Sequence, residues 1–244
     1  MQRIIPHLWF DKEALEAAEF YVSLFENSKI LNTTTITDTP SGDSEIADFQ
    51  LANLNITAIS AGPYFTFNPS ISLMVACGNK EEVDRLYHRL SSEGKELMPL
   101  GEYPFSKYYV WLEDKYGLSW QLNLVDDVES YPKIRPVLLF ADEVCGQAED
   151  AIDYYVSVFK DSHKGFINRY ADGEANDKRA RINNGEADLN GNKFILFGLS
   201  WQIVPENMNT LLSEGSEAEI QRATEALLKM KKLDIAALEK ARLG

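Results

Sequence analysis

The sequence is poor in cysteine, histidine and basic residues. It has two cysteines and three histidines among 244 residues. Two cysteines cannot form the disulfide framework of a secreted domain, so we expect a protein of a reducing, cytoplasmic compartment. Lys and Arg number 24 against 38 Asp and Glu, which gives a net charge of −14. This balance argues against nucleic acid and against a membrane surface as partners, because both attract clustered positive charge.

Long apolar runs are also missing. No stretch reaches the length of about 18 apolar residues that a membrane span requires. Residues 1–10 lack the basic and then apolar segments of a signal peptide. The apolar fraction of 45% and the charged fraction of 25% are typical of a globular protein. The length suffices for one large domain or two of ordinary size.

The strongest signal is internal repetition. Residues 5–10 and 20–25 recur as 135–140 and 154–159, and the pentapeptide Gly-Leu-Ser-Trp-Gln at 117–121 recurs unchanged at 198–202. The two copies of the pentapeptide lie closer together in the sequence than the two copies of the earlier segments. The reason is that 56 residues of the first copy, 61–116, have no counterpart in the second copy. We therefore expect a complete first copy and a truncated second copy.

Each full copy is itself doubled, because a unit of one strand, one helix and three strands occurs in it twice. Apolar residues at intervals of three and four predict the helices, and short apolar runs bounded by turn residues predict the strands. Ser216 and Glu219 form a capping box that begins a helical tail. The predicted organisation is a complete domain at 1–126, a truncated domain at 134–210 and C-terminal helices at 216–244.

Four motifs carry a family resemblance. They are Pro-His-Leu-Trp-Phe at 6–10, Ala-Ala-Glu-Phe-Tyr at 17–21, Gly-Pro at 62–63 and Asp-Lys-Tyr-Gly-Leu-Ser-Trp-Gln at 114–121. Together they resemble the PhnB-like branch of the vicinal oxygen chelate superfamily, which includes glyoxalase and bleomycin resistance proteins. Many members of this branch are named 3-demethylubiquinone-9 3-methyltransferase. The resemblance covers residues 4–125 and, in part, 134–210.

The resemblance implies an α+β fold of tandem βαβββ modules. In each full copy, two modules would curl into a half-open mixed β-barrel around a cavity. The methyltransferase name is not expected to describe the activity. The sequence has no glycine-rich loop that follows a strand and precedes an acidic residue by about 20 positions.

The positions that hold a metal ion in glyoxalase-like relatives are mostly unsuited to one here. The resemblance places four His or Glu ligands on the first and last strands of the two modules. At these positions or beside them this sequence has His7, Ser60, either Ser70 or Ser72, and Gln121. His7 and Gln121 are therefore weak metal candidates, and no carboxylate accompanies them. We predict no cofactor, with a divalent metal ion as the less favoured alternative.

The resemblance also implies a ligand cavity in the first copy. Its predicted lining combines apolar walls with a few polar groups, as in many small-molecule sites: His7, Trp9, Ser60, Ser72, Tyr109, Trp111, Gln121 and Asn123. If the protein is an enzyme, His7 is the acid–base candidate. The alternative is a protein that sequesters a ligand without chemistry, as drug-resistance relatives do, or a structural module. Trp120 is predicted to belong to the core, against a helix.

The truncation predicts a partner chain. Without the missing 56 residues, the unit at 134–197 would keep an open apolar face and an unpaired strand edge. We therefore expect a homodimer in which the second copies complete each other, or a cover made by the C-terminal helices. Glu113, Asp114 and Lys115 are predicted to form a solvated turn.

Overall fold

The computed structural model describes residues 4–39, 42–175, 177–197, 216–229 and 235–243. The chain divides into two compact units, Met1–Ser200 and Trp201–Gly244. Residues 198–210 of the predicted second domain lie outside the described residues, so its boundaries stay a prediction. No helix in the described part of the chain is both long and apolar enough to cross a bilayer.

The first unit contains three βαβββ modules, as the α+β prediction requires. Module 1 is made of β1 (His7–Phe10), α1 (Ala14–Val22), β2 (Lys29–Thr39), β3 (Gly42–Leu51) and β4 (Leu54–Ser60). Module 2 is made of β5 (Ile71–Cys77), α2 (Lys80–Leu90), β6 (Lys95–Tyr103), β7 (Ser106–Glu113) and β8 (Ser119–Leu124). Module 3 is made of β9 (Ile134–Leu139), α3 (Ala148–Val158), β10 (His163–Arg169), β11 (Ile182–Leu189) and β12 (Asn192–Phe197). Two short 3-10 helices, η1 (Val128–Ser130) and η2 (Asp142–Val144), lie between β8 and α3.

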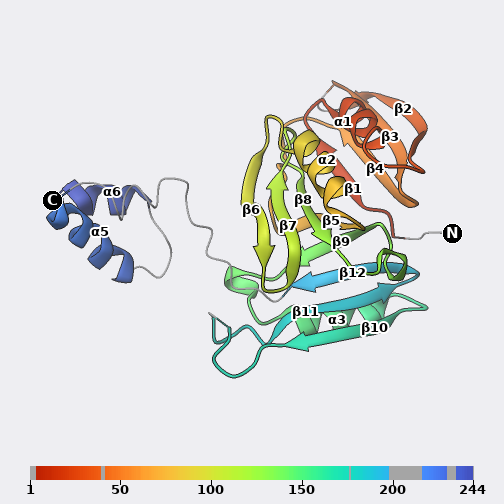
Figure 1. Cartoon of the computed structure of the whole chain (residues 1–244). Coiled ribbons are helices and arrows are strands. Elements are labelled where there is room, and N and C mark those ends of the chain that lie inside the picture. Colours follow the sequence, from red (N-terminus) through yellow and green to blue (C-terminus); the bar gives the residue numbers. More distant parts are fainter. Residues whose placement is uncertain (1–3, 40–41, 176, 198–215, 230–234, 244) are drawn as a thin grey trace. The chain divides into compact units, whose positions relative to one another are not determined.

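The strands form two sheets (Figure 1). Module 1 has its own four-stranded sheet in the order β1-β4-β3-β2, and modules 2 and 3 share an eight-stranded sheet in the order β10-β11-β12-β9-β5-β8-β7-β6. Within each module the first strand runs parallel to the last. Between modules 2 and 3 the first strands, β5 and β9, run antiparallel. The shared sheet therefore joins the second half of the first copy to the start of the second copy.

Modules 1 and 2 belong to separate sheets, which are not closed barrels and agree with the predicted half-open arrangement. The pairing corrects one expectation, because the first strand of residues 134–197 is not an unpaired edge. The reason lies in the linker at 125–133, whose two ends are tied to β5. The Val125 N–H donates to the Cys77 carbonyl (2.9 Å), and the Ala76 N–H donates to the Lys133 carbonyl (2.9 Å). The chain thus turns back along the free side of β5, which β9 fills.

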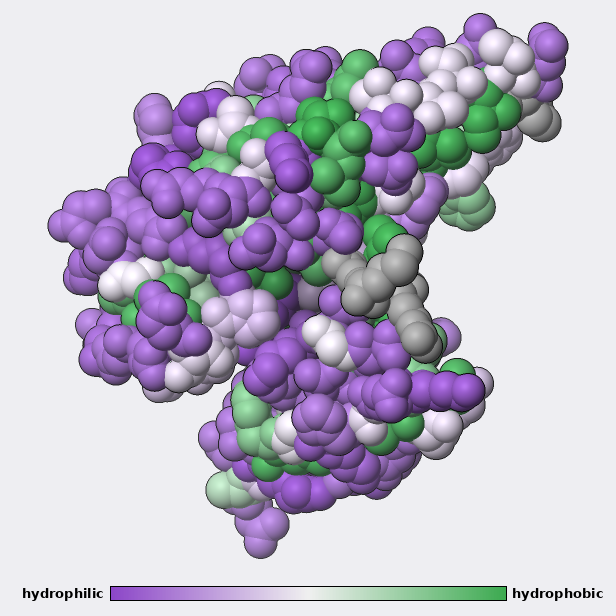
Figure 2. Space-filling view, turned by 90° about the vertical axis from the view of Figure 1, so that its right-hand side faces the viewer, coloured by the Kyte–Doolittle hydropathy of each residue, from purple (hydrophilic) through white to green (hydrophobic). Residues whose placement is uncertain are grey.

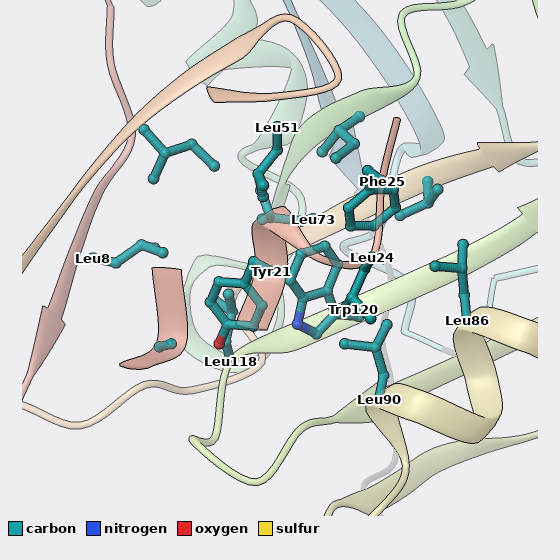
Figure 3. Packing of buried hydrophobic residues seen from close by; sticks show 14 of the residues in the cluster. Leu8, Tyr21, Leu24, Phe25, Leu51, Leu73, Leu86, Leu90, Leu118 and Trp120 are labelled. Atoms are coloured by element: carbon teal, nitrogen blue, oxygen red, sulfur yellow. The ribbon is translucent and has the colours of Figure 1, made fainter. Parts of the chain in front are cut away.

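Modules 1 and 2 instead share a hydrophobic core (Figure 3). Trp120 on β8 is fully buried, as predicted, and its ring lies 5.2 Å from Tyr21 and 5.9 Å from Phe25 between ring centroids. Leu86 and Leu90 of α2 complete the surroundings of the indole. Small residues at Ala14, Ala17 and Ala18 line the buried face of α1. Module 3 has a separate core, in which Ile152 of α3 packs with Ile182 and Leu196.

Asp114 anchors this shared core, and the prediction of a solvated turn was wrong for it. Its carboxylate is buried and accepts hydrogen bonds from the Tyr21 hydroxyl (2.7 Å) and the Trp120 indole N–H (2.8 Å). It also accepts from the backbone N–H groups of Tyr116 (2.9 Å) and Leu118 (3.1 Å). Four donors satisfy a carboxylate that the sequence pattern alone assigns to the surface.

The second unit consists of α5 (Glu217–Lys229) and α6 (Ile235–Leu243). Ala223 and Leu238 are buried, one on each helix. The capping box is confirmed, because Ser216 Oγ accepts from the Glu219 N–H (3.3 Å) while the Glu219 carboxylate accepts from the Ser216 N–H (2.7 Å).

Candidate functional site

Within the described part of the first unit, one face of the eight-stranded sheet carries no helix. On β5, Leu73, Val75 and Cys77 belong to the core on the α2 side. Since side chains alternate along a strand, the residues between them point the other way. The strand register extends this set across β7, β8, β9, β11 and β12. We call it the helix-free face: Ser72, Met74, Ala76, Tyr109, Trp111, Ser119, Gln121, Asn123, Arg135, Val137, Glu186, Lys193 and Ile195.

A relay of three buried side chains crosses the middle of this face. The Tyr109 hydroxyl donates to Gln121 Oε1 (2.6 Å), and Gln121 Nε2 donates to Ser72 Oγ (2.7 Å). Beside it, the Trp111 indole N–H donates to Ser119 Oγ (2.7 Å). Burial raises the pKa of the Tyr109 phenol, so this group is a proton donor and not a phenolate. Both functional atoms of the Gln121 amide are therefore used inside the protein.

A buried ion pair lies on the part of the same face that module 3 provides. Arg135 Nη1 lies 3.1 Å from Glu186 Oε2, and their side chains are 5% and 8% exposed. Lys193 Nζ lies 3.0 Å from the second oxygen of the same carboxylate. The Arg135 guanidinium also lies over the Tyr131 ring, 4.6 Å from its centroid. Arg135 and Lys193 thus share one carboxylate.

Two buried atoms on the helix-free face have no hydrogen-bond partner: Asn123 Oδ1 and Arg135 Nε. One is an acceptor and the other is a donor. Buried polar atoms in folded proteins are nearly always paired, so each unpaired one calls for a water molecule or a ligand. Asn123 lies on β8 and Arg135 on β9, with β5 between them. Strand spacing and register place their Cα atoms about 12 Å apart.

The structure does not bring the eight predicted cavity residues together. Ser72, Tyr109, Trp111, Gln121 and Asn123 share the helix-free face. His7 and Trp9 lie on the four-stranded sheet, where His7 is exposed and the Trp9 indole N–H donates to the Gly62 carbonyl (2.9 Å). Ser60 points to the opposite side of that sheet and accepts from the Ala14 N–H at the start of α1 (3.0 Å). The register pairs Ser60 with Phe10 and not with His7, which accounts for the difference.

Sequence reasoning missed Arg135, Glu186, Lys193 and Met74. One signal was available: Arg135 is the only charged residue in the strand Ile-Arg-Pro-Val-Leu-Leu, and its counterpart in the first copy is the apolar Ile5. A charge that replaces an apolar residue within a buried strand marks a functional position or a buried ion pair.

Glyoxalase-like relatives hold a metal ion with residues of the first and last strands of their modules. On the helix-free face, the corresponding strand positions carry side chains of other kinds. The first and last strands of modules 2 and 3 present Ser72, Gln121, Arg135 and Ile195 there, none of which is an anion or an imidazole. Among the described residues no three His, Cys, Asp or Glu side chains gather in a metal-binding arrangement.

Two hollows lie mostly elsewhere on the described chain, and the first reaches the helix-free face at Lys193. A groove of about 740 Å³ is bordered by Phe25, Leu54, Arg85, Tyr131 and Lys193, among others. A smaller one of about 380 Å³ is bordered by Asp11, Asp43, Ser60 and Tyr64. Ser60 is the one residue of the predicted cavity that borders either of these two hollows.

A family model described as 3-demethylubiquinone-9 3-methyltransferase matches residues 2–123 and 132–229. The chain belongs to this family. The match covers both copies and confirms the resemblance that the motifs carry. The gap between the matched stretches coincides with the linker between β8 and β9.

Two solved structures resemble the chain. A PhnB protein from Bacillus cereus, described as a 3-demethylubiquinone-9 3-methyltransferase, is 41% identical and covers 51% of this chain and 100% of its own, with a TM-score of 0.48. Glyoxalase I from Zea mays is 14% identical and covers 80% of this chain and 68% of its own, with a TM-score of 0.50. The maize enzyme supports the fold alone. No curated protein matches the chain.

Proposed function

We propose that this member of the family binds a small organic molecule on the helix-free face of the eight-stranded sheet. The observation that carries the proposal is the pair of unpartnered buried atoms, Asn123 Oδ1 and Arg135 Nε, on an otherwise paired face. Apolar walls with a few fixed polar groups are typical of small-molecule sites. Modules 2 and 3 each contribute one of the two atoms, so the site belongs to both copies of the repeat.

The chemistry of the two atoms restricts the ligand. Arg135 offers an N–H of a charged guanidinium, which suits a carboxylate or a carbonyl oxygen. Asn123 offers an acceptor, which suits a hydroxyl or an amine. Met74, Trp111 and Val137 are buried on the same face and provide apolar and aromatic surface. A hydroxylated aromatic carboxylic acid combines these features.

Binding on this face needs no resident metal ion. The guanidinium of Arg135 is a permanent cation. It lies on one of the strands that carry metal ligands in glyoxalase-like relatives. A divalent cation there would meet the Arg135 guanidinium, and the neighbouring Glu186 carboxylate already serves two cations. The divalent metal therefore stays the less favoured alternative.

The same residues favour binding without acid–base chemistry. Burial keeps the Tyr109 phenol protonated, and His7 lies on the other sheet. A ligand-sequestering role agrees with this arrangement better than catalysis does, because general acid–base catalysis needs a group that titrates near the working pH.

The test is a titration followed by ¹⁵N NMR. The probes are 4-hydroxybenzoate, benzoate and aliphatic hydroxy acids, each added with and without EDTA. We expect at least one probe to shift the NMR signals of the Trp111 indole N–H and the Arg135 Nε–H. Each shift should have the same size with EDTA as without it. The indole signals of Trp120 in the core and Trp9 on the other sheet serve as internal controls. No saturable shift at Trp111 with any probe, or a shift that EDTA abolishes, contradicts the proposal.

A further inference from the structure

The C-terminal end of α3 presents exposed apolar side chains. Tyr154, Val158 and Phe159 are 64%, 54% and 37% exposed, and we call these three residues the α3 patch. Figure 2 shows hydrophobic surface (green) among hydrophilic surface in the lower part of the view, which module 3 occupies. The α3 patch lies on the opposite side of the eight-stranded sheet from the helix-free face, because α3 packs on that other side.

The repeat shows that the same surface is covered in module 1. The counterparts of the α3 patch, 134 positions earlier, are Phe20, Leu24 and Phe25. Leu24 and Phe25 are only 2% and 7% exposed. The same helix end is therefore buried in the first copy and exposed in the second copy.

The helix α2 contributes to the cover of α1. Leu86 and Leu90 of α2 are fully buried in the core that contains Leu24 and Phe25 (Figure 3). α2 lies within residues 61–116, the stretch that has no counterpart in the second copy. The second copy therefore lacks the helix that would cover the end of α3.

Two arginines of α2 complete its contact with module 1. Arg85 Nη1 donates to the Leu24 carbonyl, just beyond the end of α1 (3.0 Å). Arg89 Nη2 donates to Ser23 Oγ (3.4 Å), and the Arg89 guanidinium lies over the Phe20 ring, 5.6 Å from its centroid. Cations suit this position because the carbonyl end of a helix carries a partial negative charge.

The end of α3 keeps the groups that such arginines contact. Ser157 corresponds to Ser23, and the Tyr154 ring corresponds to the Phe20 ring. The Ser157 hydroxyl donates to the Tyr154 carbonyl (2.6 Å), as the Ser23 hydroxyl does to the Phe20 carbonyl (2.6 Å). The last carbonyls of α3 have no partner within the helix, as at any helix end. The two helix ends thus offer the same apolar, aromatic and hydrogen-bonding groups.

We propose that the α3 patch is a docking site for an amphipathic helix of a partner protein. This helix carries two arginine–leucine pairs one turn apart, as α2 does in Arg-Leu-Tyr-His-Arg-Leu at 85–90. Its leucines pack on Val158 and Phe159, one arginine lies over the Tyr154 ring, and the other arginine binds the carbonyls at the end of α3. The α2 helix of a second copy is not available for this contact, because α1 already covers it. The proposal is independent of the ligand site on the helix-free face.

The probe for this site is a fluorescein-labelled synthetic peptide with the sequence of residues 79–91. A lactam between the side chains of Lys80 and Asp84, which are exposed and one helical turn apart, keeps the peptide helical. The control peptide carries the changes Arg85→Glu and Arg89→Glu. Fluorescence anisotropy measures the binding of each peptide to the full chain.

Two matched variants of the full chain locate the site. Val158→Lys places a charge in the α3 patch, and Val144→Lys places the same charge on η2, before the helix. The two valines are 54% and 42% exposed, so both variants should fold, which circular dichroism checks. We expect saturable micromolar binding of the lactam peptide to wild type and to Val144→Lys. Val158→Lys and the control peptide should each weaken binding by about ten-fold or more.

Three results overturn the proposal. The first is the absence of saturable binding of the lactam peptide to the wild-type chain. The second is equal binding to Val158→Lys and Val144→Lys, since the peptide would then bind at another surface. The third is a wild-type dimer in light scattering that Val158→Lys dissociates, because a second copy would then occupy the α3 patch.

Discussion

Met74 on β5 lies opposite Arg135 on β9 in the antiparallel register, and Arg135 Nη2 lies 3.9 Å from the Met74 sulfur. This contact crosses the junction between the two copies of the repeat. It places a guanidinium from the second copy beside Gln121 and Ser72 of the first copy, on one sheet. The pairing of β5 with β9, the first strands of modules 2 and 3, therefore determines which residues can contact one ligand molecule.

Replacing Asn123 by leucine should stabilise the ligand-free protein. The change removes a buried oxygen without a partner, so we expect the free energy of unfolding to rise by about 1 kcal/mol. The control is Asn55→Leu on β4, where Oδ1 accepts from Gln50 Nε2 (3.0 Å) and the change should cost about 1 kcal/mol. Urea unfolding measures both, and equal losses for the two variants would contradict the assignment of Asn123.

Replacing Arg135 by methionine should destabilise the protein by about 3–5 kcal/mol. The change leaves Glu186 buried with Lys193 alone, and removal of one partner from a buried pair carries this cost. The double variant Arg135→Met, Glu186→Leu should recover much of the loss, because the one charge left without its partner, on Lys193, is 37% exposed and can be hydrated. Additive losses in this double-mutant cycle would show that the two side chains do not act as a pair.

Asp114 should make stability depend on pH in a specific direction. Burial raises the pKa of its carboxyl above the ordinary value, and the hydrogen bonds from Tyr21 and Trp120 oppose this only in part. Because its pKa is raised in the folded state, the Asp114 carboxyl stabilises the fold fully at pH values below the unfolded-state pKa. This stabilisation is lost as pH rises through the folded-state pKa.

The advantage of wild type over Asp114→Asn should therefore shrink as pH rises from acid towards neutral. Urea unfolding over that range measures it. Asp126→Asn is the control, because Asp126 is exposed and pairs with Lys107 at the surface. An advantage that grows with pH would contradict the raised pKa.

Neither cysteine should react quickly in the folded protein. Burial raises the pKa of Cys77 to about 12 and also raises that of Cys145, so little thiolate is present at neutral pH. Labelling with a disulfide reagent should be slow without denaturant and rapid in its presence. Rapid labelling of one thiol in the folded state would show that its segment opens.

The sequence was sufficient for the modules and their order. Residue spacing predicted the helices at α1 and α2, and the Trp120 environment followed from its strand position. Asp114 escaped prediction because its four donors come from α1, from β8 and from its own turn, which only the tertiary structure brings together. A charged tripeptide gives no local sign of such burial.

The pairing of modules could not be read from the repeat. Either β1 or β9 could in principle add to β5, since both carry the same strand pattern. The linker at 125–133 decides between them by returning the chain along β5. His7 and Trp9 were therefore grouped with Gln121 in one cavity, although they lie on a different sheet.

The most direct test of a ligand site shared by two modules is a set of nuclear Overhauser effects from a bound probe to the protein. With the carboxylic acid that binds best, we predict contacts from one ligand molecule to the Trp111 indole of module 2 and to the Val137 methyl groups of module 3. Contacts confined to a single module, or contacts to Trp9 and His7 in their place, would contradict a site on the helix-free face.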